Sequence, residues 1–221
     1  MHERSCRLLV MTQTDGRILR GEQTRRAILR RAADIASAEG LEGLSIGRLA
    51  TELNISKSGV FTHFGAKEEL QLATVRAAVE VFTEHVVKPA LATPRGLGRV
   101  VRLVEIWLTY MERPIFPGGC FFYSAGAEFD ARPGRVHDAI AHAQRDWLAF
   151  LERCLTQARD LGELHEDTDA AQLAFELEAL ARCGGAQALL FDDPTTYDRA
   201  RRAVNTRLRT AATDPSTITG P

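Results

Sequence analysis

Apolar residues recur at the three- and four-residue spacing of a helix along most of the chain, and the alternation typical of strands is nearly absent. Gly and Pro interrupt this pattern at several points, among them Gly40, Gly65 and Pro94. The segments between the interruptions predict an all-α fold of about nine helices. We expect these helices at about 24–39, 46–53, 57–64, 67–88, 97–111, 120–129, 135–161, 169–190 and 195–210.

The second and third of these helices are short, and only the turn Asn54-Ile55-Ser56 separates them. Two short helices joined by a tight turn are the geometry of a helix-turn-helix, which presents its second helix to the major groove of DNA. Such a unit needs apolar residues inside and polar residues at the groove. We expect Ile46, Leu49, Ala50, Leu53, Ile55, Val60, Phe61 and Phe64 inside, and Thr51, Ser56, Lys57, Ser58 and Thr62 outside. A generic pair of helices meets the same conditions, so the pattern alone leaves both interpretations open.

Charge is distributed unevenly along the chain. The 28 basic and 29 acidic side chains nearly cancel, which argues against a protein that coats nucleic acid through bulk charge. Residues 1–76, however, carry 12 Lys or Arg against 9 Asp or Glu, and residues 1–31 carry 8 against 3. The sequence therefore combines a basic front end with an acidic remainder.

The four cysteines are Cys6, Cys120, Cys154 and Cys183, and they lie far apart with no CxxC pair. Free thiols in a reducing cytoplasm are the simplest interpretation. The chain shows no signal peptide and no apolar run long enough to span a membrane. We expect a cytoplasmic protein that holds no metal and no cofactor.

The helix-turn-helix region also carries a specific sequence. The run Ile55-Ser56-Lys57-Ser58-Gly59-Val60-Phe61-Thr62-His63-Phe64-Gly65-Ala66-Lys67-Glu68-Glu69-Leu70 resembles the DNA-binding domain of the TetR (TetR/AcrR) family of bacterial transcriptional regulators, and the resemblance covers about residues 22–72. It implies a three-helix head at 22–66 and a six-helix ligand-binding and dimerisation body at 67–210. Before the head we expect a flexible basic arm at 1–21, and after the body a disordered tail at 211–221 with nothing to bury.

The resemblance implies that the protein is a regulator and not an enzyme. We expect a repressor that binds a palindromic, double-stranded DNA operator as a homodimer. A small, largely apolar or aromatic molecule in the body would release it, and ligand and DNA would then weaken each other's binding by the same factor. A DNA-binding activator, or a repressor without a ligand, fits the same residues.

The resemblance also assigns residues to the DNA contact. Ser45 caps the helix that crosses the DNA backbone, Ser56 opens the recognition helix, and His63 holds the backbone. Tyrosine is usual at the position of Phe61, so one hydroxyl contact to a phosphate is missing. Arg17, Arg20, Arg25 and Arg26 form either an arm toward the minor groove or a solvated basic tail. The predicted contact set is Arg25, Ser45, Arg48, Ser56, Lys57, Ser58, Gly59, Phe61, Thr62, His63 and Lys67.

Aromatic residues cluster around the helix-breaking stretch 113–119, where seven of the chain's 15 fall within positions 107–129. Irregular backbone surrounded by aromatic rings favours a cavity for an apolar ligand, although ordinary core packing produces the same cluster. Glu105, Glu128 or Asp130 are candidate polar anchors. The predicted lining is Trp107, Tyr110, Met111, Phe116, Cys120, Phe121, Phe122, Tyr123, Phe129, Trp147, Phe150 and Cys154.

The helix expected at 169–190 has few charges and many small residues. A helix with one face in water would carry more charged residues, so we expect this one to be covered on all sides. With the helix at 195–210 it is typical of half a two-fold four-helix interface. A buried central helix in a monomer is the alternative. The predicted interface is Leu173, Leu177, Leu180, Ala181, Gly184, Ala188 and Arg201.

Two other functions compete with a ligand-responsive regulator. A small-molecule enzyme lacks support because the sequence has no Gly-rich phosphate loop, no GxSxG and no HExxH. His137 and His142 are five residues apart, which is a poor spacing for one metal. A thiol-based redox sensor would use Cys120 or Cys154, but no flanking basic cluster favours a thiolate at either one.

Overall fold

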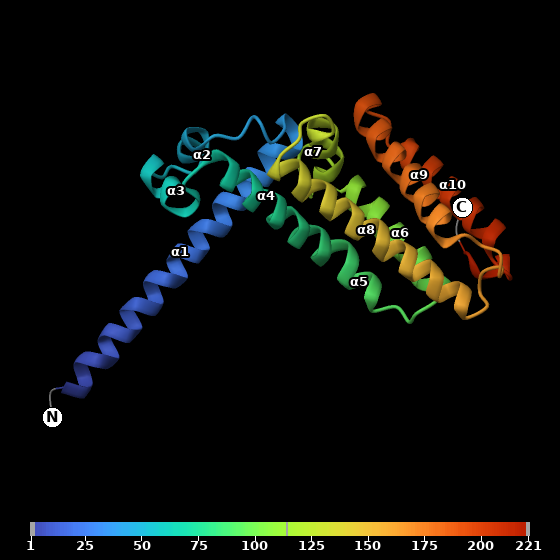
Figure 1. The fold of residues 1–221 in the computed structure, drawn as a ribbon, viewed down its shortest axis with the longest axis horizontal. Helices are drawn as coiled ribbons and strands as arrows, with labels where there is room; N and C mark the ends of the chain where they lie inside the picture. The colour runs from blue at the N-terminus through green and yellow to red at the C-terminus, as the bar shows by residue number, and fades with distance from the viewer. Residues whose placement is uncertain (1–2, 114, 220–221) are drawn as a thin grey trace.

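The computed structural model describes the backbone of residues 3–113 and 115–219, and the side chains of residues 18–113 and 115–219. The π-helix η1 joins α4 to α5 without a break. When α4, η1 and α5 are counted as one run, the described residues form nine helices and one 3-10 turn, as predicted (Figure 1). The elements are α1 (Glu3–Glu39), α2 (Ile46–Glu52), α3 (Lys57–Phe64), α4 (Lys67–Phe82), η1 (Thr83–Val87), α5 (Lys88–Leu91), α6 (Leu97–Glu112), α7 (Phe121–Phe129), α8 (Arg135–Asp160), α9 (Ala170–Phe191), α10 (Thr195–Ala211) and η2 (Pro215–Thr217).

Local residues set the helix ends of the head. The Ser45 hydroxyl accepts the Arg48 N–H at 3.1 Å and begins α2, and the Ser56 hydroxyl accepts the Gly59 N–H at 3.0 Å and begins α3. Gly40 ends α1 with a φ of 85°, which favours glycine. Asn54 holds the turn between α2 and α3 with a φ of 52°. These caps explain why the sequence placed the two short helices within one residue of their observed ends.

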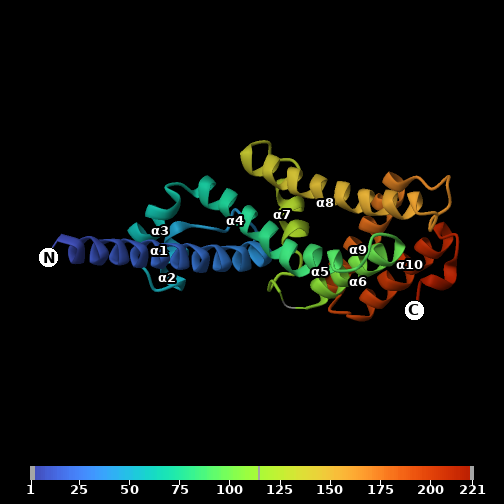
Figure 2. The ribbon, with the colours of Figure 1, turned by 90° about the horizontal axis from the view of Figure 1, so that it is seen from below.

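The molecule is elongated, with the head at one end and α9 and α10 at the other (Figures 1 and 2). α4 packs against α1 of the head and against α8 of the body, so it leads from one into the other. One apolar core runs through both parts, from Ile28 in α1 through Leu70 in α4 to Leu208 in α10. The head is therefore packed onto the body and is not an independent unit on a linker.

The flexible arm predicted for residues 1–21 is not observed, because α1 begins at Glu3 and runs without a break to Glu39. No proline interrupts this segment, and Gly16 and Gly21 each cost only about 1 kcal/mol in a helix. The extension projects from the head as a single rod (Figure 1). Cys6 and Arg17 were part of the sequence predictions, but their side chains lie outside the described residues.

The prediction of a disordered tail at 211–221 is also wrong for residues 211–219, the part that the structure describes. Ala212 forms a single antiparallel bridge with Leu164, and the Thr213 N–H donates to the Glu163 carbonyl at 3.1 Å. Ile218 is only 3% exposed, and the Arg209 guanidinium donates to its carbonyl. The tail is ordered because the 162–168 loop offers it both backbone partners and an apolar site.

Pro89 was expected to end the long helix, but the helical run continues to Leu91. Proline lacks an N–H, and its ring clashes with the carbonyl four residues earlier in a regular helix. The preceding π-helix widens the turn, so that the Lys88 N–H donates to the Thr83 carbonyl five residues back.

No helix among the described residues is long and apolar enough to cross a membrane.

Candidate DNA-binding head and ligand cavity

The recognition helix α3 presents a polar surface. Ser56, Lys57, Ser58 and Thr62 are all exposed, as predicted for the groove side. The Ser56 and Ser58 hydroxyls lie 3.1 Å apart, and the Thr62 hydroxyl donates to the Ser58 carbonyl at 2.7 Å. The first N–H groups of α3 therefore open beside two hydroxyls, an arrangement suited to a phosphate or a base edge.

Phe61 lies on this surface and not inside, which corrects the sequence prediction. The side chain is 56% exposed, whereas Val60 and Phe64 on either side are buried as expected. An exposed phenyl ring on the outer face of α3 has no role in the core of the head. The position that lacks the usual hydroxyl therefore faces the region where DNA would lie.

Arg48 is held within the protein by two carboxylates. Its Nη2 donates to Glu39 at 2.6 Å and its Nε donates to Glu52 at 2.9 Å, and Arg31 binds the same Glu52. This network joins the end of α1 to α2. Arg48 therefore fixes the angle between the two helices, and we do not count it among free phosphate ligands.

Lys67 is also paired. Its ammonium donates to the carboxylate and to the carbonyl of Glu42 at 2.8 Å each, and Gln71 donates to the same carboxylate. The Lys67 hydrogen bond lowers the pKa of Glu42. Lys67 ties the start of α4 to the loop after α1, and it is still about half exposed toward solvent.

The remaining predicted contacts lie around α3. The Arg25 guanidinium is 5.4 Å from the centre of the Phe64 ring and so packs on the end of the recognition helix. The His63 ring is partly exposed beside the same ring. A Cβ on Gly59 would lie 3.1 Å from the Ser56 hydroxyl, so glycine leaves room for the N-cap. No atom of α2 lies within 4 Å of that Cβ position, so packing against α2 does not require a glycine here.

The body contains a cavity of about 1050 Å³ between α4, α6, the 118–120 loop, α7, α8 and α9. Seven of the twelve predicted residues line it: Trp107, Met111, Cys120, Phe122, Tyr123, Trp147 and Phe150. Edge-to-face contacts fix the rings, with Trp147 lying 4.9 Å from Phe82 and 5.0 Å from Trp107 between ring centres. Phe82 was missed by the sequence analysis because it lies on α4, far along the chain from the aromatic cluster.

The other five predicted residues belong to the core and do not line the cavity. Tyr110, Phe116, Phe121, Phe129 and Cys154 are all buried. Four of them lie on helix faces turned away from the cavity, and Phe116 lies in the irregular segment before α7, under the Arg30 guanidinium. Helical spacing alone does not distinguish a cavity wall from a packed face.

The three candidate polar anchors are also wrong. Glu105 pairs with Arg201, and Glu128 holds the loop after α1. Asp130 is exposed and does not line the cavity. The charged residues that do line it are Glu178 and Arg182, which pair with each other on α9, and Asp146 on α8.

The cavity wall and the head share one segment. Gly118, Gly119 and Cys120 line the cavity, while the Gly118 N–H donates to the Ser37 hydroxyl of α1 at 3.1 Å. Nearby, Arg30 of α1 donates to the Ile115 carbonyl, and its guanidinium lies 5.1 Å from the Phe116 ring centre. These contacts connect the ligand space directly to α1.

Glu128 at the end of α7 makes a second connection. Its carboxylate accepts the Leu41 N–H at 2.6 Å and the Glu42 N–H at 3.0 Å. Both N–H groups belong to the loop between α1 and α2. Segment 115–128 therefore contacts the cavity on one side and the head on the other.

Five of the seven residues predicted at the dimer interface are not on the surface of the protomer. Leu173, Leu177, Ala181, Gly184 and Ala188 are buried inside the protomer, and Leu180 is partly buried. Arg201 is bound by Glu105, Glu112 and Asp198 of the same chain. The exposed apolar residues of α9 are instead Phe175, Leu189, Leu190 and Phe191, with Phe175 60% and Leu190 79% exposed.

Neither candidate thiol has the surroundings of a sensor. Burial raises the pKa of Cys120 and the pKa of Cys154, which disfavours the reactive thiolate. Among the described residues, no group of three or more His, Cys, Asp or Glu side chains could hold a metal ion.

Two family models match the chain. Residues 28–74 match the model described as bacterial regulatory proteins of the tetR family, and residues 96–204 match the tetracyclin repressor-like C-terminal domain. The first match contains α2 and α3, and the second contains most of the cavity wall.

Individual proteins show the same similarity. The HTH-type transcriptional regulator YezE of Bacillus subtilis (strain 168) is 24% identical over 160 residues, which cover 66% of this chain and 76% of that protein. A TetR transcriptional regulator from Chloroflexus aurantiacus superposes with a TM-score of 0.81 at 22% identity, over 87% of this chain and 98% of that one. A regulator from Saccharomonospora viridis, solved in complex with choline, has a TM-score of 0.68 at 25% identity, over 84% of this chain and 95% of that one.

Proposed function

The chain belongs to the TetR family of bacterial DNA-binding transcriptional regulators, and we propose from this premise that it is a repressor released from its operator by a small molecule. This family consists of regulators and not of enzymes. The observation that carries the proposal is the shared segment 115–128, which lines the cavity and hydrogen-bonds to α1 and to the loop after it.

The proposed DNA contact centres on α3. Ser56, Lys57, Ser58 and Thr62 would meet base edges, because the N-terminal part of a recognition helix lies deepest in the groove. Ser45 at the start of α2 and His63 at the end of α3 would meet phosphates. Arg48 and Lys67 would act mainly by holding the head in shape, since both already have carboxylate partners.

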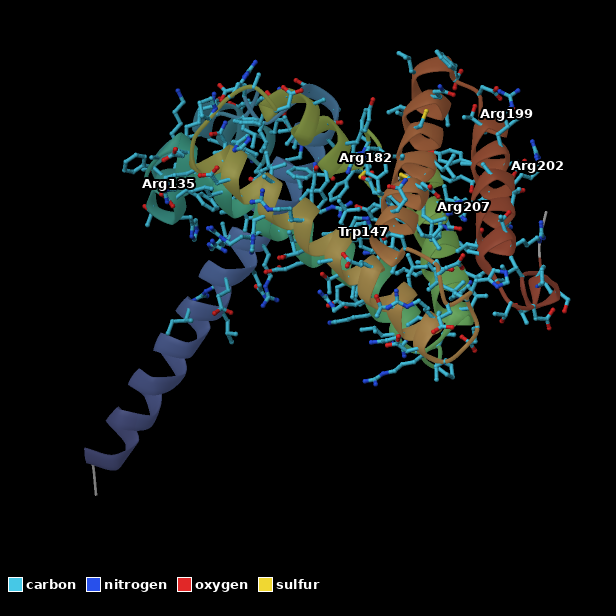
Figure 3. All side chains as sticks on the ribbon, turned by 45° about the vertical axis from the view of Figure 1, so that its right-hand side comes forward. Arg135, Trp147, Arg182, Arg199, Arg202 and Arg207 are labelled. Carbon is cyan, nitrogen blue, oxygen red and sulfur yellow. The ribbon has the colours of Figure 1, made fainter. Side chains whose placement is uncertain are left out.

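A homodimer is part of the proposal. Phe175 and Phe191 of α9 are exposed in the protomer and lie outside the cavity lining, and they would pack against the same helix of a second copy. Two heads on a two-fold axis would then reach half-sites about 34 Å apart on a palindrome. Arg199 and Arg202 are exposed on the side of α10 that points away from α9 (Figure 3).

Release would follow from the position of the cavity. A ligand that displaces segment 115–128 would move α1 and the loop that Glu128 holds, and the two heads would no longer match both half-sites. The ligand would be largely apolar or aromatic, because seven aromatic rings line the space. The choline complex of the Saccharomonospora viridis regulator supports a small-molecule role for the corresponding body.

A gel-shift experiment tests the proposal. The protein should shift its own upstream intergenic DNA at low salt, and deletion of its gene should raise transcription of the adjacent operon. If the DNA is not shifted, the protein does not act at this site. If it is shifted and deletion lowers transcription, the protein is an activator. The thiol-sensor alternative has no observation in its favour, since burial raises the pKa of both candidate thiols.

A further inference from the structure

The cavity is almost entirely apolar, and its one internal ion pair determines which charged ligand it can accept. Glu178 and Arg182 lie one turn apart on α9, and the Arg182 Nε donates to Glu178 Oε1. Figure 3 shows Arg182 and Trp147 on neighbouring helices α9 and α8, and both line the cavity.

The two partners of this pair differ in burial. The Glu178 side chain is 11% exposed, whereas the Arg182 side chain is 29% exposed. The long arginine side chain can turn toward water and keep its charge solvated. The glutamate cannot follow it, and a buried carboxylate without a cationic partner is strongly disfavoured. The fixed member of the pair is therefore the negative one.

This difference in burial determines which sign of charge the ligand can carry. An anion bound to Arg182 would draw the guanidinium away from Glu178 and leave the buried carboxylate unpaired. A cation can replace the guanidinium against Glu178 while Arg182 moves into solvent. Apart from this pair, the charged lining within the described part of the chain is Asp146 alone, which is largely exposed and lies 3.3 Å from His142, so Glu178 and Arg182 are the charges that face the interior of the cavity.

The aromatic rings that line the cavity also favour a positively charged ligand. Phe82, Trp107, Phe122, Trp147 and Phe150 line the same cavity as Glu178, and the faces of such rings carry negative potential. A cation near them gains cation–π attraction, most strongly where water is excluded. The ring faces would not attract an anion, while the buried indole N–H groups of Trp107 and Trp147 have no acceptor among the described residues and can donate to an acceptor atom of a ligand of either charge.

We propose that the ligand of the cavity is a hydrophobic organic cation, whose positive group takes the place of the Arg182 guanidinium against the Glu178 carboxylate. This inference rests on the proposed function, because it names the chemical class of the molecule that would release the DNA.

The experiment compares two ions of the same shape and opposite charge, tetraphenylphosphonium and tetraphenylborate. Trp107 and Trp147 are the chain's only tryptophans and both line the cavity, so their fluorescence reports its occupancy directly. We expect the cation to quench this fluorescence with an affinity at least tenfold higher than that of the anion. Tighter binding of the anion would overturn the proposal.

Two variants separate the roles of the pair. Glu178→Gln should weaken cation binding at least tenfold, and Arg182→Gln should strengthen it several-fold because the competing guanidinium is gone. Glu176→Gln, on the same helix but outside the cavity lining, is the matched control and should change neither affinity. If Glu178→Gln does not fold, the Arg182 variant decides, and weaker cation binding by Arg182→Gln would overturn the proposal.

The outcomes also distinguish this inference from the proposed function. If the anion binds better and releases the protein from its DNA, the ligand-released regulator stands and the charge class is wrong. If neither ion changes the tryptophan fluorescence, the cation proposal fails. Loss of the gel shift in the absence of any ligand would instead contradict DNA binding itself.

Discussion

Gly118 lies against the backbone of α1, and its replacement by alanine tests the contact that joins the cavity wall to the head. A Cβ at this position would lie 2.1 Å from the Ser37 carbonyl oxygen and 2.5 Å from the Ala38 nitrogen. Ordinary contact begins near 3.4 Å, so the alanine is roughly 1.3 Å too close. The opposing atoms are backbone and cannot rotate away as a side chain would. The φ of Gly118 lies outside the left-handed region, so steric contact alone decides the outcome.

Overpacking of this kind costs about 1–3 kcal/mol, and backbone contact places Gly118→Ala near the upper end. For a chain of this length each kcal/mol lowers Tm by about 2–4 °C, so we expect a fall of about 6–12 °C in thermal unfolding followed by circular dichroism. Gly98→Ala is the control. Gly98 lies in α6, and a Cβ there would meet no atom within 4 Å beyond the adjacent backbone of its own helix, so alanine should raise stability by about 0.4–1 kcal/mol. Equal Tm values for Gly118→Ala and the unchanged protein would refute the close approach.

Three further predictions concern the head and the dimer. Phe61→Tyr should tighten DNA binding up to about fivefold in gel shifts, since a new phosphate hydrogen bond is worth about 1 kcal/mol; the same change at Phe191, at the end of α9 and outside the recognition helix, should have no effect. Phe175→Asp should reduce the mass measured by light scattering toward the 24.4 kDa of one chain, whereas Leu161→Asp, equally exposed at the end of α8, should not. Lys67→Met should destabilise the protein by less than about 1 kcal/mol at pH 7, because the pair with Glu42 is half exposed. The pKa of Glu42 is lowered in the folded protein, so its contribution is full above the ordinary value of 4.5 and is lost as the pH falls below it. Urea unfolding at pH 7 and pH 3 should show the gap between variant and parent narrowing in acid, and a gap independent of pH would contradict the ion pair.

The sequence by itself determined the helices and the identity of the head. Helix ends depend on neighbouring residues, such as the Ser45 and Ser56 caps and the positive φ of Gly40, and these interactions are local in the chain. The run from Ile55 to Leu70 identified the family because its residues are contiguous in the chain and belong to one local structure, the helix-turn-helix and the start of α4. Where local signals were absent the predictions failed, as with the start of α1 and the ordered tail.

Only the tertiary structure decided which face of each helix meets which neighbour. α9 is apolar on nearly all sides, so its sequence could not show that Leu173 and Leu177 pack inward while Phe175 and Leu190 face outward. The same limit explains why Trp147 lines the cavity and Phe121 does not. Helical spacing fixes a residue's direction relative to its own axis. What covers that direction depends on helices distant in the chain, and it was this packing that placed Glu178 and Arg182 beside the rings and segment 115–128 against α1.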